Sequence, residues 1–175
     1  GSTVNTIDKF PFASDSNATD VGDLTNITQD APGQSSTTYG YTSGGGNPIL
    51  NIIRKFPFAA DANATDVGDL TQARTQTSGQ SSFVSGYTSG GAAPSYSNTI
   101  DKFPFASDDN ATDVGDLATA RSYVAGQSST ASGYTTGGAP GPNGNNIIEK
   151  FPFAADGNAT DVGDLTQARR AATGQ

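Results

Sequence analysis

The amino-acid sequence predicts an all-β protein built from repeated units of about 47 residues. The first observation is a sixteen-residue block, KFPFASDSNATDVGDL, which begins at Lys9 and returns almost unchanged at Lys55, Lys102 and Lys150. The second is the absence of any long segment with the 3.6-residue apolar spacing of an amphipathic helix. The third is the abundance of short β-rich segments between Gly, Pro, Asn and Ser. A block that recurs four times is typical of a structural unit that packs on copies of itself.

Two further blocks follow the first and define the units. GQSS begins at Gly33, Gly79 and Gly126, with its first two residues again at Gly174-Gln175, and GYTSGG or GYTTGG begins at Gly40, Gly86 and Gly133. We interpret residues 1–175 as one repeat array with units of about 1–45, 46–91, 92–138 and 139–175, the last one incomplete. The segments after the Gly-Gly pairs, GNPILN, AAPSYSN and APGPNGNN, vary in length, and their composition predicts surface loops.

Each unit is expected to contain four short strands. In the second unit these are residues 51–58, 66–71, 77–82 and 85–91, with Ile52, Arg54 and Phe56 on one face of the first strand. Phe56 and Phe58 are predicted to be core residues. The last two strands consist of small residues, which suit the crowded centre of a radial array. Four short strands in a repeat of this length match one blade of a β-propeller.

The order of these features resembles the kelch repeat. Fifteen residues separate Arg74 from Gly90, the first glycine of a Gly-Gly pair, and Tyr87 lies three residues before that glycine. The third unit repeats this spacing with Arg121, Tyr134 and Gly137. The tryptophan of the kelch pattern is missing, with Val67 and its equivalents roughly in its place, and the first unit has Thr28 where the others have arginine. The resemblance implies a kelch-like β-propeller of four units of four strands each. Because the fourth unit lacks its last two strands, three arrangements stay open: part of a longer propeller, a ring completed by a second chain, or an irregular closure.

The amino-acid sequence of the repeat, NATDVGDLT followed by GQSS and GYTSGG, is also similar to repeats in virion proteins of marine bacteriophages, including cyanophages. This resemblance implies a non-enzymatic structural or recognition module of a virion surface or tail, located on a virion or outside the cell. Its expected partners are proteins or glycans, through self-association or contacts with other virion proteins. Two alternatives stay open: a secreted or cell-surface adhesin that binds glycans or proteins, and a designed or consensus repeat protein.

The composition excludes several kinds of chemistry. Cys, His, Met and Trp are absent, which removes disulfides, imidazole and thiolate ligands, and Ser-His or Cys-His catalytic pairs. The carboxylates recur identically in every unit, whereas acid–base catalysis needs two different environments, so we expect no enzyme. A net charge of −8 argues against nucleic acid as a partner. No apolar run approaches the length of a membrane helix, so we expect no insertion into a membrane.

The acidic residues of the repeated block allow one metal hypothesis. Each unit carries the string D-x-N-x-x-D-x-G-D, which starts at Asp15, Asp61, Asp108 and Asp156. Closely spaced oxygen ligands suit Ca²⁺, but the glycine is at the eighth position and no glutamate closes the loop. We therefore expect no cofactor and interpret the string as a capped Asx turn, with Ca²⁺ binding as the alternative.

The candidate binding residues are those that differ between units. On repeat scaffolds such differences gather at one rim, which is often the binding face. Tyr96 and Tyr123 each occur in one unit only and are our candidate ligand contacts, and we expect no catalytic residue.

Overall fold

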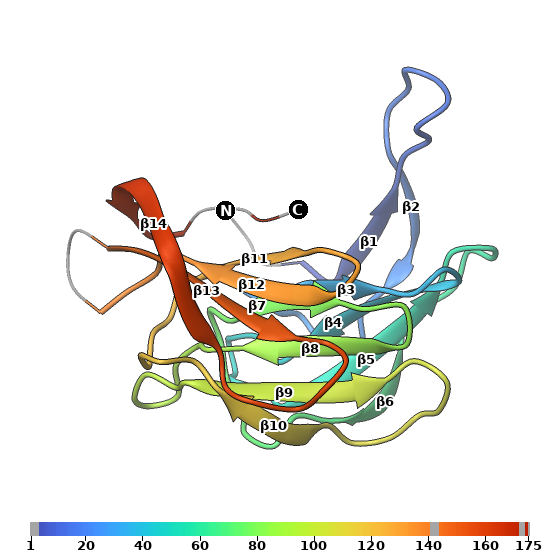
Figure 1. Ribbon diagram of the computed structural model, residues 1–175. Helices are drawn as coiled ribbons and strands as arrows, with labels where there is room; N and C mark the ends of the chain where they lie inside the picture. Colours follow the sequence, from blue (N-terminus) through green and yellow to red (C-terminus); the bar gives the residue numbers. More distant parts are fainter. Residues whose placement is uncertain (1–3, 141–143, 172–173, 175) are drawn as a thin grey trace.

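The computed structural model describes residues 4–140, 144–171 and 174, and within these ranges it contains fourteen β-strands and no helix (Figure 1). The strands form one two-stranded and three four-stranded sheets, with antiparallel neighbours throughout. The prediction of an all-β protein is therefore confirmed. The first three sequence units each contain four strands, as expected, and the fourth contains two within the described residues. Four four-stranded sheets do not form, because no further strand of the described residues pairs with the first two.

The four sheets follow the order of the chain. The two-stranded sheet consists of β1 (Thr6–Lys9) and β2 (Thr19–Asp23). The first four-stranded sheet consists of β3 (Gly33–Ser35), β4 (Tyr39–Ser43), β5 (Ile52–Pro57) and β6 (Thr65–Asp69). The second consists of β7 (Ser78–Ser81), β8 (Ser85–Ser89), β9 (Thr99–Pro104) and β10 (Thr112–Asp116). The third consists of β11 (Ala125–Ser128), β12 (Ser132–Thr136), β13 (Asn145–Pro152) and β14 (Thr160–Arg169).

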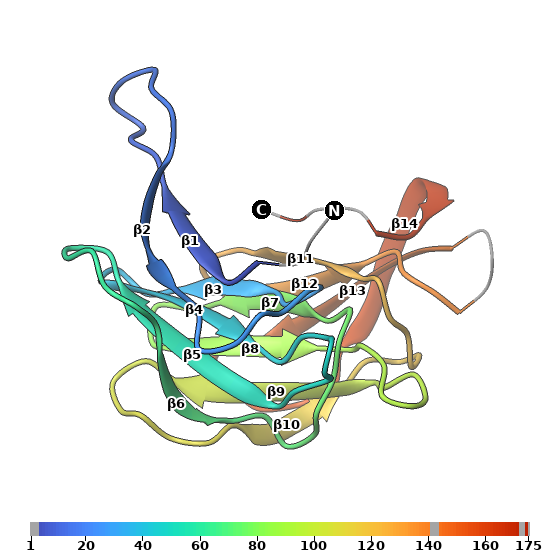
Figure 2. The same ribbon diagram turned by 180° about the vertical axis from the view of Figure 1, so that it is seen from behind.

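Each four-stranded sheet joins two sequence repeats. Its first two strands are the small-residue hairpin of one unit, and its last two carry the Lys-Phe-Pro-Phe block of the next. We call these pairs the inner and outer hairpins. The sheets follow one another around a common centre, with β3, β7 and β11 innermost (Figures 1 and 2). Backbone N–H groups of Ser35 and Ser81 donate to the Ser81 and Ser128 hydroxyls of the next inner strand, at 3.0 and 2.9 Å. The arrangement is consistent with a β-propeller.

Aromatic rings of one sheet pack against the preceding sheet. Tyr41 of β4 contacts Phe103 and Phe105 of the second sheet, with ring centroids 5.5 and 4.9 Å apart. Tyr87 of β8 contacts Phe151 and Phe153 of the third sheet in the same way, at 5.5 and 4.8 Å. Phe103 and Phe151 are both buried. The hydrophobic core is thus a series of small clusters between sheets, and each of these aromatic contacts adds to the stabilisation from buried area.

The prediction that Phe56 and Phe58 are core residues is wrong for the first four-stranded sheet. Phe58 is exposed and Phe56 is only half-buried, although both occupy the positions of Phe103 and Phe105. The reason is the preceding sheet, β1–β2, which has no inner hairpin within the described residues and so provides no tyrosine to cover them.

The strand register also departs from simple alternation. A β-bulge between Ile53 and Arg54, opposite Gly68 and Asp66, lets both consecutive side chains be buried. Gly68 needs to be glycine, because its φ is +153° and a Cβ there would lie 2.6 Å from the Asp109 carbonyl oxygen of the next sheet. The bulge therefore brings neighbouring outer hairpins into close contact.

Two sheets contain a buried ion pair between an arginine and a strand carboxylate. The Arg74 guanidinium donates to the carbonyls of Gly90 and Thr99 at 3.0 and 2.9 Å, and its Nη2 lies 2.5 Å from Asp101 Oδ2. In the third sheet Arg121 Nη2 lies 2.8 Å from Glu149 Oε2. All four side chains are buried. Burial lowers the pKa of both arginines, and the neighbouring acid opposes this effect.

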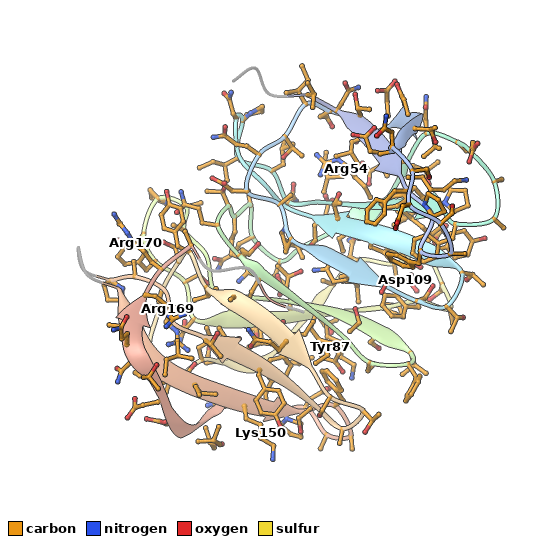
Figure 3. The ribbon with its side chains drawn as sticks, turned by 90° about the horizontal axis from the view of Figure 1, so that it is seen from above. Arg54, Tyr87, Asp109, Lys150, Arg169 and Arg170 are labelled. Atoms are coloured by element: carbon orange, nitrogen blue, oxygen red, sulfur yellow. The ribbon has the colours of Figure 1, made fainter. Side chains whose placement is uncertain are left out.

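In the first four-stranded sheet, a guanidinium also binds the carbonyl of the first glycine in the Gly-Gly pair, but it comes from a strand and not from a linker. Arg54 lies on β5 at the position of Asp101, and Thr28 replaces Arg74. The buried Arg54 side chain (Figure 3) donates to the Gly44 carbonyl at 3.2 Å and to Thr25 Oγ1 at 2.9 Å. Burial lowers its pKa. The carbonyl of the first glycine in the Gly-Gly pair thus receives a guanidinium in both cases.

Candidate binding site

Most of the segments that differ between units lie together on one face of the array of sheets. The linkers 28–32, 74–77 and 121–124 each connect an outer hairpin to the next inner hairpin, and residues 169–171 occupy the equivalent position after the last outer hairpin. Isolated β-bridges join Gln29 to Gly46, Thr75 to Ala92 and Ser122 to Ala139, so the loops after the Gly-Gly pairs lie beside the linkers. We call this surface the linker face; it is at the left in Figure 1. Residues 141–143 of the third variable loop lie outside the described residues.

A hydrogen-bonded ladder crosses the linkers at this face. It consists of the residue two positions after each arginine or its replacement: Asp30, Gln76, Tyr123 and Ala171. The carbonyl of each of the first three accepts a hydrogen bond from the N–H of the next, at 3.1, 2.9 and 3.0 Å. All four have a left-handed backbone, with φ between 54° and 59°. Non-glycine residues rarely adopt this conformation, which costs about 1–3 kcal/mol and is concentrated at functional sites.

The ladder borders a hollow of about 450 Å³ at the centre of the linker face. Its lining includes Asp30, Gln76 and Tyr123 together with one glycine from each inner strand: Gly33, Gly79 and Gly126. Gln76 Nε2 donates to the Tyr123 hydroxyl at 2.8 Å, and the Arg170 guanidinium lies 5.9 Å from the Tyr123 ring centroid. The lining of the hollow therefore includes an aromatic ring, an amide and a carboxylate, and the Arg170 guanidinium lies beside the ring. All four residues occupy positions that differ between units.

The two tyrosines predicted as ligand contacts have different surroundings. Tyr123 is 36% exposed and lines the hollow. Tyr96 is 47% exposed in the loop after Gly91 and bridges to Ala92, but it is not among the residues that line the hollow. The structure thus places Tyr123 in the candidate site and leaves Tyr96 on the outer part of the linker face.

Asp30 and Gln76, the other variable residues at this hollow, were not predicted as ligand contacts from the sequence. A position-by-position alignment of the units would have found them, because they occupy the place of Tyr123 in the first two linkers. Phe83 was not predicted either; it is 77% exposed at the tip of an inner hairpin and lines a second hollow, of about 480 Å³, on the opposite face. Its signal was that Phe83 is the one phenylalanine outside the Phe-Pro-Phe blocks.

The repeated acidic string has structural partners. The second Asp of each string accepts from the backbone N–H of the glycine two residues later, at 3.0–3.3 Å. The Asn oxygens of the second, third and fourth strings accept from the N–H of Asp23, Asp69 and Asp116 in the preceding unit, each at 3.0 Å. Within the described ranges, no group of three or more Asp, Glu, His or Cys is placed to hold a metal ion.

The most perturbed carboxyl group lies away from both hollows. Burial raises the pKa of Glu149, and the Arg121 guanidinium opposes this shift. Glu149 is fully buried between strands, so a substrate has no access to it. Its role is structural, in the pair with Arg121.

No protein-family model matches the chain, and no curated protein matches it. Among the described residues, no helix is long and apolar enough to cross a membrane.

Proposed function

We propose that this chain is a non-enzymatic recognition module, built as a kelch-like β-propeller, that binds its ligand at the linker face. The proposal includes a location on a virion surface or tail, with a role in assembly or host attachment. The proposed location on a virion is supported only by the similarity of the repeat sequence to repeats in marine phage proteins. The recognition role is supported by the distribution of repeated and variable residues over the molecule.

That distribution is the observation that carries the proposal. Residues that are the same in every unit are used between units: the lysines and acidic strings join outer hairpins, and the phenylalanines and tyrosines fill the clusters between sheets. Residues that differ gather at the ladder and its hollow, where strained backbone fixes their positions. A rigid frame with variable side chains at one rim is a common design of binding proteins.

The chemistry of the hollow favours a saccharide among the expected partners. Tyr123 presents a half-exposed ring for stacking, while Gln76 and Asp30 supply an amide and a carboxylate for hydroxyl groups. A few oriented polar groups beside an aromatic surface are the usual composition of a small-molecule site. This observation is also what favours the second candidate function, a cell-surface adhesin that binds glycans.

The test is binding of the purified chain to an immobilised panel of bacterial polysaccharides and to isolated cell envelopes. Tyr123→Ser and Gln76→Ala should each reduce binding by about tenfold or more, the effect of losing a central contact. Replacement of residues 92–98 by a Gly/Ser linker, which removes Tyr96, tests the outer part of the face.

Phe83→Ser is the matched control, because it removes an exposed aromatic residue from the opposite face. If Phe83→Ser abolishes binding while Tyr123→Ser and the loop replacement leave it unchanged, the proposal is wrong and the hairpin tips form the site. If only a substitution in the repeated acidic string removes binding, the acidic turns are the site.

A further inference from the structure

Successive outer hairpins make the same contact at all three junctions in the structure. At each junction a lysine of one unit pairs with the first Asp of the next unit's acidic string: Lys9 with Asp61, Lys55 with Asp108, and Lys102 with Asp156. The next unit's alanine N–H also donates to an aspartate carbonyl, as in Ala64 to Asp23 at 2.8 Å. The junction is therefore a defined interface with two different sides. We call the side that carries the lysine the donor surface, and the side that carries the next unit's acidic string the acceptor surface.

Close packing completes this interface. A Cβ on Gly22, Gly68 or Gly115 would lie 2.4–2.6 Å from a carbonyl oxygen of the next unit's turn. Val67 and Val114, which precede two of these glycines, pack against the clusters between sheets. Tyr41 and Tyr87 cover the phenylalanines of the following sheet. Any further interface of this kind therefore needs the lysine–aspartate pair, the close approach at the glycine, and a tyrosine that covers the phenylalanines.

The last outer hairpin carries all the residues of the donor surface, and no described residue covers it. Lys150 is exposed and makes no ion pair within the described part of the chain, and its side chain lies at the periphery of the molecule in Figure 3. A Cβ on Gly163 would meet nothing within 4 Å, unlike its three equivalents. Val162 is 51% exposed, whereas Val67 and Val114 are partly buried.

The acceptor surface of the first outer hairpin is likewise left uncovered by the part of the chain that the structure describes. Residues 10–18 form its turn, which projects from the body of the protein (Figures 1 and 2). Among the described residues, Asp15 has no lysine partner, and the Asn17 side chain makes no hydrogen bond. Phe10 is exposed, and Phe12 is 97% exposed, although its equivalents Phe105 and Phe153 pack on tyrosines.

We propose that these two surfaces bind each other between two copies of the chain, head to tail. Lys150 of one copy pairs with Asp15 of the other, the Asp164 N–H donates to Asn17, and Tyr134 covers Phe10 and Phe12. The occupant is a second copy because the donor and acceptor surfaces carry the same side chains as the three junctions within the chain. Such a heterologous contact joins copies into a ring or an open assembly. This inference does not depend on the proposed ligand site.

The experiment is sedimentation of the full chain over a range of micromolar concentrations at low and moderate salt. We expect an association that strengthens with concentration and weakens with salt, since exposed charges contribute. Lys150→Glu and Asp15→Lys should each weaken it by about tenfold through like-charge contacts. The double variant Lys150→Glu/Asp15→Lys should restore it, as should mixing the two single variants. Phe12→Ser should also weaken it.

Asp109→Lys is the matched control, because it makes the same charge change on an exposed side chain (Figure 3) of an internal turn. It should leave the association unchanged, and the thermal midpoint of every variant verifies folding. The proposal is overturned if the chain stays monomeric at all concentrations. It is also overturned if the charge variants associate as the parent does, or if the double variant fails to recover.

Discussion

The sheets β3–β6 and β7–β10 bring a guanidinium to the same backbone carbonyl from different residues. In β7–β10 the linker residue Arg74 reaches the Gly90 carbonyl and pairs with Asp101 on the strand. In β3–β6 the strand residue Arg54 reaches the Gly44 carbonyl, and Thr28 stands in the linker. Both sheets thus provide a guanidinium donor for the carbonyl of the first glycine in the Gly-Gly pair. A strand carboxylate pairs with that guanidinium only where the arginine lies in the linker. The linker position and the strand position differ together between the two sheets, so we treat them as a coupled pair.

Reversing the charge of one member alone should have the largest effect. Asp101→Arg places a second buried guanidinium against Arg74, and we expect a loss on the order of 5 kcal/mol in the free energy of unfolding. The double variant Arg74→Thr/Asp101→Arg reproduces the Thr28/Arg54 arrangement and should recover most of that loss. Urea unfolding of the four proteins of this cycle measures the coupling. A double variant as unstable as Asp101→Arg would show that the two sheets are not equivalent.

Truncation of the equivalent phenylalanines sharpens the same comparison. Phe103→Ala should cost about 3–5 kcal/mol, because the ring is buried under Tyr41. Phe56→Ala should cost about half as much or less, since no tyrosine covers that ring within the described residues. Thermal unfolding of both variants tests this. Equal losses would mean that Phe56 is covered in solution, for example by another chain.

The third sheet extends the comparison to pH, through Glu149. Burial raises its pKa in the folded state above the unfolded value. Protonation therefore favours the folded protein, and this contribution is present below the unfolded pKa of about 4.3 and is lost as the pH rises through the folded pKa. Glu149→Gln should gain stability relative to the parent as the pH rises from 4 to 7. A constant difference between the two unfolding free energies over that range would contradict the shift.

The smallest effects are expected at the lysines of the outer hairpins. Lys55→Met removes a partly exposed ion pair with Asp108 and should change the unfolding free energy by about 1 kcal/mol or less. The hydrogen bond to Asp108 raises the pKa of Lys55, so its contribution is present below the unfolded pKa and is lost as the pH rises through the folded value. Chemical denaturation at pH 8 and at high pH compares the variant with the parent. A large loss at pH 8 would mean that the pair is desolvated in solution.

Much of the fold could be predicted from the sequence, because the repeats carry local signals. The strands around Phe56, the turns rich in Asp and Asn, and the small-residue hairpins all follow from residue types and spacing. The bulge at Ile53 and Arg54 could not be predicted, since it depends on pairing with a strand eleven or more residues away. The exposure of Phe58 depends on which hairpin covers it, and local sequence carries no record of that.

The candidate site was predictable in outline only. Variation between units pointed to Tyr123, but the ladder that joins it to Gln76 and Asp30 is made by backbone groups about 46 residues apart. The buried pairs between arginine and carboxylate were also unpredicted, because they join residues 27 and 28 positions apart, Arg74 with Asp101 and Arg121 with Glu149, across an intervening hairpin.

The offset between sequence repeats and sheets has a consequence for how the protein unfolds. Because each four-stranded sheet takes one hairpin from each of two neighbouring units, no single unit forms a complete four-stranded sheet. Melting the second unit alone would remove β5 and β6 from one sheet and β7 and β8 from the next, which leaves two broken edges. In repeat proteins, stability divides into terms within units and terms between them, and here the terms between units include strand pairing itself. Partly unfolded states should therefore be sparsely populated, and heating should give one sharp transition for the array.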